Sequence, residues 1–154
     1  MKAEEKIREF LENNNVETKV LVFTETTRTS QDAAKQAGCE LARIAKSIVF
    51  RVNDEPILVI TSGPNKVSET KLEKLVGEKI GKADAEFVYE KTGFPIGGVA
   101  AFCHKTPLKH VFIDEDLTRF EKVWSAAGTP FAIFEISTSK LIELSRAKIA
   151  DIKQ

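Results

Sequence analysis

One lysine lies on the apolar face of a predicted strand, and it is the first residue that could do chemistry. In the run from Ile44 to Val52, every second residue starting at Ile44 is apolar except Lys46. Alternate residues of a strand share one face, so this ammonium group would lie among apolar side chains. A buried ammonium is costly unless it meets an anionic or strongly polar partner. Two interpretations stay open: Lys46 extends its charge to water from the strand end, or it lies in a ligand pocket.

The pair Gly97 and Gly98 ends a turn-forming stretch, 92–98, that contains three glycines and a proline. Residues without a Cβ can bring backbone N–H groups close to a carbonyl oxygen or an anion, as an oxyanion site requires. A bend that simply needs glycine is the alternative interpretation. The spacing does not match G-x-G-x-x-G, and G-x-x-x-x-G-K-[ST] does not occur, so no nucleotide-binding loop is predicted.

The cysteines and histidines suggest little further chemistry. Cys39 and Cys103 are far apart without a C-x-x-C motif, so both are expected as reduced thiols. Cys103 and His104 resemble a thiol nucleophile and its base, but adjacent side chains on an extended strand point to opposite faces. His104 and His110 have no acidic or cysteine neighbours at ligand spacing, so no metal site is predicted. Asp114 follows a short apolar run, where an aspartate usually caps a turn.

The elements that must position these residues are helices mixed with paired strands. The runs Ile44–Val52 and Pro56–Thr61 are separated by Asn53-Asp54-Glu55, which favours an antiparallel hairpin. For Val123–Ala126, helix and strand both remain possible. Hairpin signals without regular alternation of single strands and helices favour an α+β fold with a mixed, mostly antiparallel sheet. Other predicted strands are 19–24, 111–113 and 131–136, and predicted helices are centred on 7–11, 29–38, 72–76, 84–91 and 137–144.

Length and charge place limits on the whole protein. The chain has 154 residues, of which 42% are apolar, so residues 1–154 are expected to form a single domain. Lys and Arg together number 23, as do Asp and Glu, and a net charge of zero argues against non-specific DNA binding and against membrane-surface binding. No apolar stretch reaches the roughly 18 to 20 residues of a spanning helix, and the first residues form a charged amphipathic segment. A cytoplasmic location is therefore predicted.

Six short motifs follow one another along nearly the whole chain. They are Thr29-Ser30-x-x-Ala33-Ala34, the run 44–50, Lys71-Leu72, the run 92–99, the run 111–114 with Leu117, and Val123-Trp124-x-Ala126-x-Gly128. In this order they resemble the YbaK and prolyl-tRNA synthetase editing-domain family. The most distinctive combination is the strand lysine followed by the Thr-Gly and Gly-Gly-Val segments.

The resemblance implies a small α+β editing fold whose mostly antiparallel sheet is barrel-like and packed with helices. It also implies a free-standing enzyme that acts in trans and hydrolyses the ester joining a wrong small amino acid, of the Ala, Cys or Ser class, to tRNA, with tRNA(Pro) as the first candidate. Its partners would be the tRNA acceptor end and, as a further candidate, an aminoacyl-tRNA synthetase, and no cofactor is implied. Lys46 and Gly98 would be catalytic. The implied substrate-binding residues are Thr29, Gly97, Val99 and His104.

The segment 97–104 departs from the pattern Gly-Gly-Val-x-Pro-Phe-Gly-His that family members often carry. Here Ala101 stands in place of the proline and Cys103 in place of the second glycine, while His104 keeps its position. This departure bears on pocket shape and amino-acid preference more than on reaction type. It also motivates an alternative function, a non-catalytic module of the same fold that binds a tRNA acceptor end or a synthetase. A Cys103-dependent thiol enzyme is a third interpretation.

Overall fold

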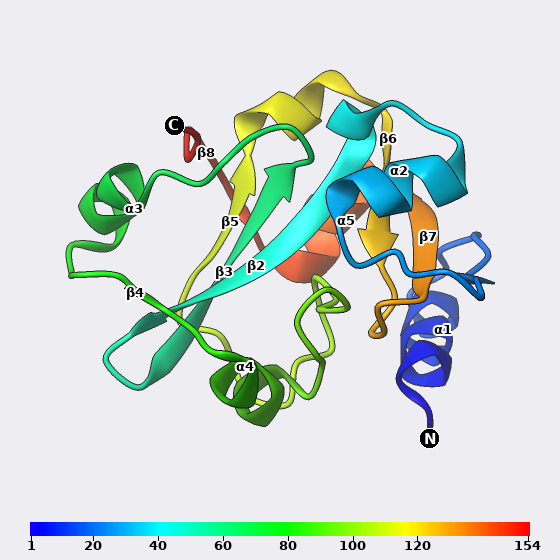
Figure 1. Cartoon of the computed structure of the whole chain (residues 1–154), viewed down its shortest axis with the longest axis horizontal. Helices are drawn as coiled ribbons and strands as arrows, with labels where there is room; N and C mark the ends of the chain where they lie inside the picture. The colour runs from blue at the N-terminus through cyan, green and yellow to red at the C-terminus, as the bar shows by residue number, and fades with distance from the viewer.

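The fold is built around a long hairpin, which the computed structural model of residues 1–154 shows at the centre of the sheet (Figure 1). Its strands are β2 (Ile44–Val52) and β3 (Glu55–Ser62), paired antiparallel so that Lys46 lies opposite Thr61. Asn53 adopts φ +56° at the turn, a conformation that asparagine tolerates better than most residues. The predicted hairpin is therefore confirmed.

Eight strands form one open, mixed sheet in the order β1-β7-β6-β2-β3-β5-β8, and β4 pairs with β2 outside this path. The pairs β2–β6, β3–β5 and β5–β8 are parallel, and the other four are antiparallel. The remaining strand bounds are β1 (Leu21–Val22), β4 (Gly81–Lys82), β5 (Val111–Asp114), β6 (Lys122–Ala126), β7 (Ala132–Ser137) and β8 (Lys148–Ala150).

The predicted α+β class is confirmed, but the predicted barrel-like sheet is wrong. The end strands β1 and β8 have two and three residues and lie at opposite ends of the sheet, so the sheet does not close. A barrel needs strands long enough to tilt and to continue the hydrogen-bond register around the whole circle. The short end strands do not provide that length.

Five α-helices lie around the sheet, and four of them begin at a side chain that caps the first turn. Thr29, Ser68, Asp84 and Ser137 each accept a hydrogen bond from the backbone N–H three residues ahead. Such caps satisfy N–H groups that have no partner within the helix. The helices are α1 (Ala3–Asn13), α2 (Ser30–Ala37), α3 (Glu69–Val76), α4 (Ala85–Thr92) and α5 (Thr138–Ser145), with short 3-10 helices at Leu41–Arg43 and Glu115–Arg119.

The two faces of β2 contribute to different parts of the apolar core. Ala45 and Val49 belong to the largest cluster, which includes Ile7 of α1. Phe50 and Val52, on the other face, pack in a second cluster with Leu72 of α3. Period-two alternation places Lys46 on this second face, as the sequence predicts. None of the helices has the length and apolar character needed to cross a membrane.

The ambiguous segment 123–126 is a strand, β6. Val123 and Ser125 are 0% and 1% exposed, whereas Lys122, the first residue of β6, is exposed and Trp124 is half-buried. This alternation fits a strand with one buried face. The helical spacing that begins at Leu117 produces only the short 3-10 turn at Glu115–Arg119. Strands β4 and β8 were not predicted, because two or three residues are too few to show a period.

Candidate active site

A gap in the sheet creates a small pocket beside Lys46. Strand β6 pairs with β2 only as far as Ala45, and β4 joins the same side of β2 at Phe50. The β2 residues between these points therefore have no strand beside them on that side. Segments from the α2 loop and from the Gly-Gly bend line this gap together with β2 and β6.

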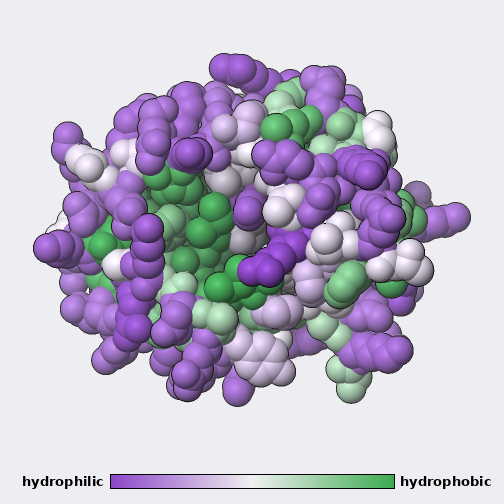
Figure 2. Space-filling model, viewed as in Figure 1, coloured by the Kyte–Doolittle hydropathy of each residue, from purple (hydrophilic) through white to green (hydrophobic).

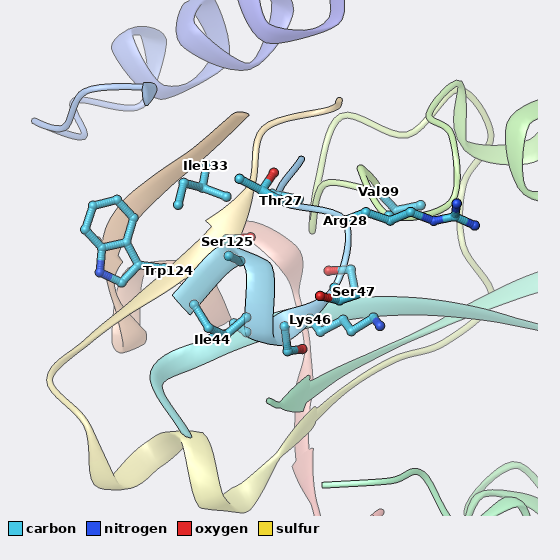
Figure 3. Close-up of a pocket in the computed structure, with 15 residues that line it drawn as sticks. Thr27, Arg28, Ile44, Lys46, Ser47, Val99, Trp124, Ser125 and Ile133 are labelled. Atoms are coloured by element: carbon cyan, nitrogen blue, oxygen red, sulfur yellow. The ribbon is translucent and has the colours of Figure 1, made fainter. Parts of the chain in front are cut away.

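The pocket in the gap has a volume of about 30 Å³ and is lined by apolar and hydroxyl side chains together with two cations. Figure 3 shows the labelled members of this lining on β2, β6 and β7, in the loop before α2 and, at Val99, after the Gly-Gly bend. A space of this size accepts roughly two or three water-sized atoms. The lining includes Thr27, Arg28, Ser30, Lys46, Ser47, Gly97, Val99 and Ser125.

A second cavity, of about 190 Å³, adjoins the first along β2. Lys46, Ser47, Gly97 and Val99 line both cavities, and the rest of the second one is apolar, formed by Ile48, Val49, Ala83, Val88 and Ile96. Figure 2 shows apolar side chains gathered in a hollow over β2 and β3, surrounded by hydrophilic ones. The shared wall places Lys46 between a small pocket of mixed lining and a larger apolar one.

Lys46 is half-buried and has no acidic partner. It takes part in none of the nine ion pairs of the chain, which involve seven of the 23 lysines and arginines. Arg28, at the same pocket, is also without an ion-pair partner. Two uncompensated cations at one opening favour a ligand that is anionic or strongly polar. Lys46 therefore lines a pocket, while part of its side chain stays exposed to water.

Four hydroxyl groups at the pocket have no hydrogen-bond partner. They belong to Thr27, Ser30, Ser47 and Ser125, and they are the only buried side-chain oxygen or nitrogen atoms of the chain in that state. Buried polar groups in proteins are nearly always paired, so an unpaired cluster needs an explanation. Sequence reasoning did not single out these four residues. A signal was present for two of them, because Ser47 and Ser125 interrupt otherwise apolar positions of β2 and β6.

The Gly97-Gly98 bend contributes to the site differently from the prediction. The N–H of Gly98 donates to the Pro95 carbonyl at 3.0 Å, so it is used inside the turn and is not available for an oxyanion. A Cβ on Gly98 would lie 2.5 Å from the backbone carbon of Thr129, which explains the glycine as a close backbone approach. The N–H groups of Gly97 and Val99 make no backbone hydrogen bond. Val99 therefore replaces Gly98 as the candidate donor.

Thr29 lies in the pocket lining and also caps α2. Its Oγ1 accepts from the Asp32 N–H at 3.0 Å, as an N-cap side chain does. The loop before it is attached to the start of β7, because the Thr27 N–H donates to the Pro130 carbonyl at 2.7 Å. Gly98 packs against the same segment, at Thr129 and Pro130. The loop before α2 and the Gly-Gly bend, which both line the pocket, are therefore held by the segment that precedes β7.

His104 does not lie at this pocket. Its Nε2–H donates to the Ala100 carbonyl at 2.7 Å, and its ring packs edge-on against Phe94, at 6.2 Å between centroids. Burial lowers the pKa of His104 below its ordinary value. The structure thus brings Lys46, Gly97, Val99 and Thr29 together at one pocket. His104 lies outside this pocket, and its hydrogen bond to Ala100 stabilises the 100–104 loop.

Cys103 is poorly suited to act as a nucleophile. Desolvation by burial raises the pKa of its thiol to about 11, so the reactive thiolate is scarce near neutral pH. The segment is not an extended strand, because Cys103 adopts φ +64°, the left-handed conformation that favours glycine. Neither Cys103 nor Cys39 forms a disulfide.

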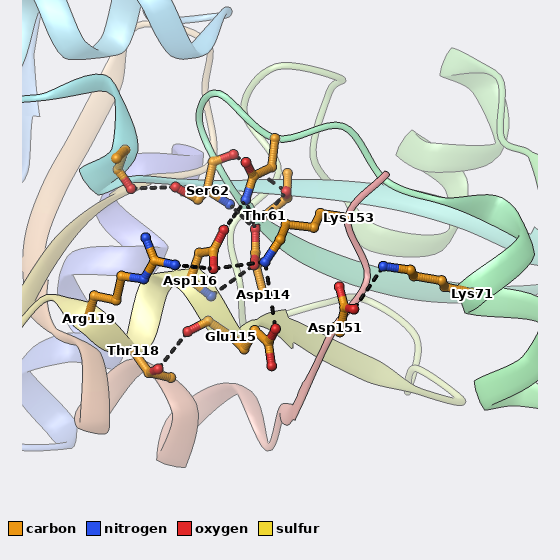
Figure 4. Close-up of polar contacts among 12 residues, drawn as sticks. Thr61, Ser62, Lys71, Asp114, Glu115, Asp116, Thr118, Arg119, Asp151 and Lys153 are labelled. Carbon is orange, nitrogen blue, oxygen red and sulfur yellow. Dashed lines mark hydrogen bonds and ion pairs between the residues drawn. The ribbon is translucent and has the colours of Figure 1, made fainter.

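Asp114 has a structural position at the end of β5 (Figure 4). It is fully buried and accepts hydrogen bonds from the backbone N–H groups of Ser62 and Asp116, at 3.0 and 2.9 Å, and from the Asn65 side chain at 2.8 Å. The predicted capping role is therefore confirmed. No group of three or more histidine, cysteine or acidic side chains is arranged to hold a metal ion.

Fold and site together define a class: a mixed, open-sheet α+β domain with a lysine-lined pocket in a break of the sheet, beside a Gly-Gly bend. Residues 24–144 match the family described as aminoacyl-tRNA editing domain. The chain belongs to this family, so the resemblance seen in the sequence is confirmed.

Relatives in sequence include a protein of similar size and a domain-sized part of a larger enzyme. The uncharacterized protein YwhH of Bacillus subtilis (strain 168) is 34% identical over 139 residues, which cover 88% of this chain and 86% of YwhH. The proline–tRNA ligase of Maridesulfovibrio salexigens is 30% identical over 108 residues, which are 70% of this chain and 18% of that ligase.

Solved structures share the fold over nearly the full length. A crystal structure of a candidate trans-editing enzyme for prolyl-tRNA synthetase has a TM-score of 0.92 and 37% identity, covering 100% of this chain and 98% of the other. The hypothetical protein APE2540 has a TM-score of 0.87 and 26% identity, covering 97% and 99%. These similarities support an aminoacyl-tRNA editing function for the fold.

Proposed function

We propose that the protein is a free-standing aminoacyl-tRNA deacylase that removes a small, wrongly attached amino acid from tRNA, with tRNA(Pro) as the first candidate. The observation that carries the proposal is the position of Lys46. Its side chain lines a pocket of about 30 Å³ without any acidic partner, next to the Gly97–Val99 backbone. Membership in the editing-domain family supports the same reaction class.

The reaction needs no protein nucleophile, because an aminoacyl ester is already activated. A water molecule attacks the ester carbonyl carbon, the bond to the ribose oxygen breaks, and the products are the free amino acid and tRNA with a restored hydroxyl group. The carbonyl oxygen carries negative charge in the transition state. Lys46 and the Val99 N–H are the groups proposed to stabilise it, and loss of one such donor typically costs about 10²- to 10³-fold in rate.

The size of the pocket supports a small acyl group. Space for roughly two or three water-sized atoms suits the side chain of alanine, cysteine or serine and excludes a larger one. A synthetase pocket gains only about 1–3 kcal/mol from one methylene, too little to reject a smaller amino acid. A small hydrolytic pocket of this kind would supply the second selection step.

The adjoining cavity supports a terminal nucleoside on the other side of Lys46. Its walls of Ile48, Val88 and Ile96 are apolar and suit the flat face of a base, and its volume of about 190 Å³ is larger than that of the acyl pocket. Arg28 and Lys46 would lie near the phosphate and ester oxygens. Because the chain has no net charge, contact would be confined to the acceptor end, and tRNA affinity would fall only gently with salt.

The test is deacylation of alanyl-, cysteinyl- and seryl-tRNA(Pro) by the purified protein and by the Lys46→Ala variant. We expect release of at least one amino acid above the buffer rate, and a loss of at least about a hundredfold in the variant with an unchanged melting temperature. Lys74→Ala, at an exposed position of α3, is the matched control and should keep full activity. Tight tRNA binding without ester loss would instead support the non-catalytic binding module.

A further inference from the structure

We infer that the acyl pocket selects a side chain that carries a hydroxyl group, so that the preferred substrate is the seryl ester over the alanyl and cysteinyl esters. This inference rests on the proposed deacylase function and concerns its specificity. It comes from the four unpaired hydroxyls at the pocket, which belong to Thr27, Ser30, Ser47 and Ser125.

These hydroxyls come from three separate parts of the chain. Thr27 and Ser30 flank the start of α2, Ser47 lies on β2, and Ser125 lies on β6. Thr27, Ser30 and Ser125 are only 5%, 4% and 1% exposed. Their convergence on one space of about 30 Å³ places several donors and acceptors around whatever occupies it.

Elsewhere the protein pairs its buried hydroxyls. Thr92 donates to the Val88 carbonyl at 2.7 Å, Ser62 to the Ala42 carbonyl at 2.6 Å, and Thr138 to the Phe120 carbonyl at 2.6 Å. Ser145 donates to the Ile142 carbonyl. The unpaired state is therefore confined to the pocket. Alanine or valine at the four positions would avoid the cost of burying an unpaired polar group, so the hydroxyls indicate a polar occupant.

The chemistry of the lining identifies that occupant. The pocket contains no carboxylate or carboxamide, and its hydroxyls can both donate and accept. A serine hydroxyl can do the same, whereas a methyl group leaves the surrounding hydroxyls unpaired and a thiol is a weak donor and acceptor. The α-ammonium group is common to all aminoacyl esters, so contacts with it would not distinguish among them.

Sites built to hydrogen-bond a substrate hydroxyl reject the analogue without it far more strongly than apolar pockets reject a missing methylene. We therefore expect kcat/KM for seryl-tRNA(Pro) to exceed that for alanyl-tRNA(Pro) by about a hundredfold or more. Removing one pocket hydroxyl, in Ser125→Ala or Thr27→Val, should reduce the seryl-to-alanyl ratio by about tenfold. Ser145→Ala removes a buried hydroxyl outside the pocket and should leave the ratio unchanged.

The ratio separates specificity from stability, because a folding defect lowers both rates together. Equal rates on seryl and alanyl esters, or an unchanged ratio in Ser125→Ala, would overturn the inference while leaving the deacylase intact. If no ester were hydrolysed, the proposed function would fail. Calorimetric binding of the non-hydrolysable 3′-amide analogues, seryl- and alanyl-amino-deoxyadenosine, then decides the inference alone: tighter seryl binding supports it, and equal affinity contradicts it.

Discussion

Gly97 packs directly against the side chain of Arg28. A Cβ on Gly97 would lie 2.4 Å from the Arg28 Cγ and 3.2 Å from its Cβ, and Gly97 itself has φ +87°. The bare Cα thus lets the aliphatic part of the arginine lie across the bend at the pocket opening. Lys46 and Arg28 line the same pocket, so this contact links the Gly-Gly bend to both cations.

Replacing Gly97 with alanine should impair activity for two reasons, a clash with the Arg28 side chain and strain in the left-handed backbone. The left-handed conformation costs a residue with a Cβ about 1–2 kcal/mol, and the new methyl group displaces Arg28. We expect Gly97→Ala to lower kcat/KM by at least about tenfold. Adding Arg28→Ala relieves the contact but not the backbone strain, so the stability measured by urea unfolding should recover only in part. Full activity of the single variant would contradict this account.

Replacing Gly98 with alanine should mainly destabilise the fold. Its Cβ would lie 2.5 and 2.7 Å from backbone atoms of Thr129 and 2.8 Å from the Pro130 nitrogen, and backbone atoms move less easily than a side chain. We expect a loss of about 3 kcal/mol in the free energy of unfolding. Gly81→Ala is the matched control, since Gly81, like Gly98, does not have a positive φ, and a new Cβ there would meet no atom closer than 3.4 Å. If both variants lost equal stability, the contact with Thr129 would be unimportant.

Removing the Asp114 carboxylate should also destabilise the protein. Its oxygens accept from Ser62, Asn65 and Asp116 in a fully buried place, so Asp114→Ala leaves several donors unpaired. We expect the free energy of unfolding to fall by about 3 kcal/mol. Asp54→Ala, which removes one exposed ion pair with Arg51, should change it by less than about 1 kcal/mol. Urea unfolding of the two variants at neutral pH makes the comparison.

The free energy of unfolding should decrease as the pH falls below neutral, because His104 is largely shielded from water in the folded protein. Burial lowers its pKa below the ordinary value of 6.5, so the unfolded chain takes up a proton at a higher pH than the folded protein does. The resulting stabilisation is complete above about pH 6.5 and is lost as the pH falls through the folded pKa. In the His104→Gln variant, the free energy of unfolding measured with urea should depend less on pH between pH 7 and 5. Comparison of the two proteins at pH 8 isolates the packing effect, and an unchanged slope in the variant would contradict the prediction.

Local sequence patterns determined most of the elements and the face on which Lys46 lies. The Asn53-Asp54 turn, the caps at Thr29 and Ser137, and the alternation from Ile44 to Val52 each act within a few residues, so their outcome depends little on the rest of the chain. Sheet closure could not be predicted in this way, because it depends on the lengths of the end strands β1 and β8, which have too few residues to show a pattern.

Only the tertiary structure decided which groups meet at the pocket. It brings hydroxyls from residues 27, 30, 47 and 125 to one space, and it directs the Gly98 N–H into a turn while leaving that of Val99 free. It also moves His104 away from Lys46. The physical reason is that these relations depend on contacts between segments far apart in the chain, such as Thr27 with Pro130, and no local periodicity records such contacts.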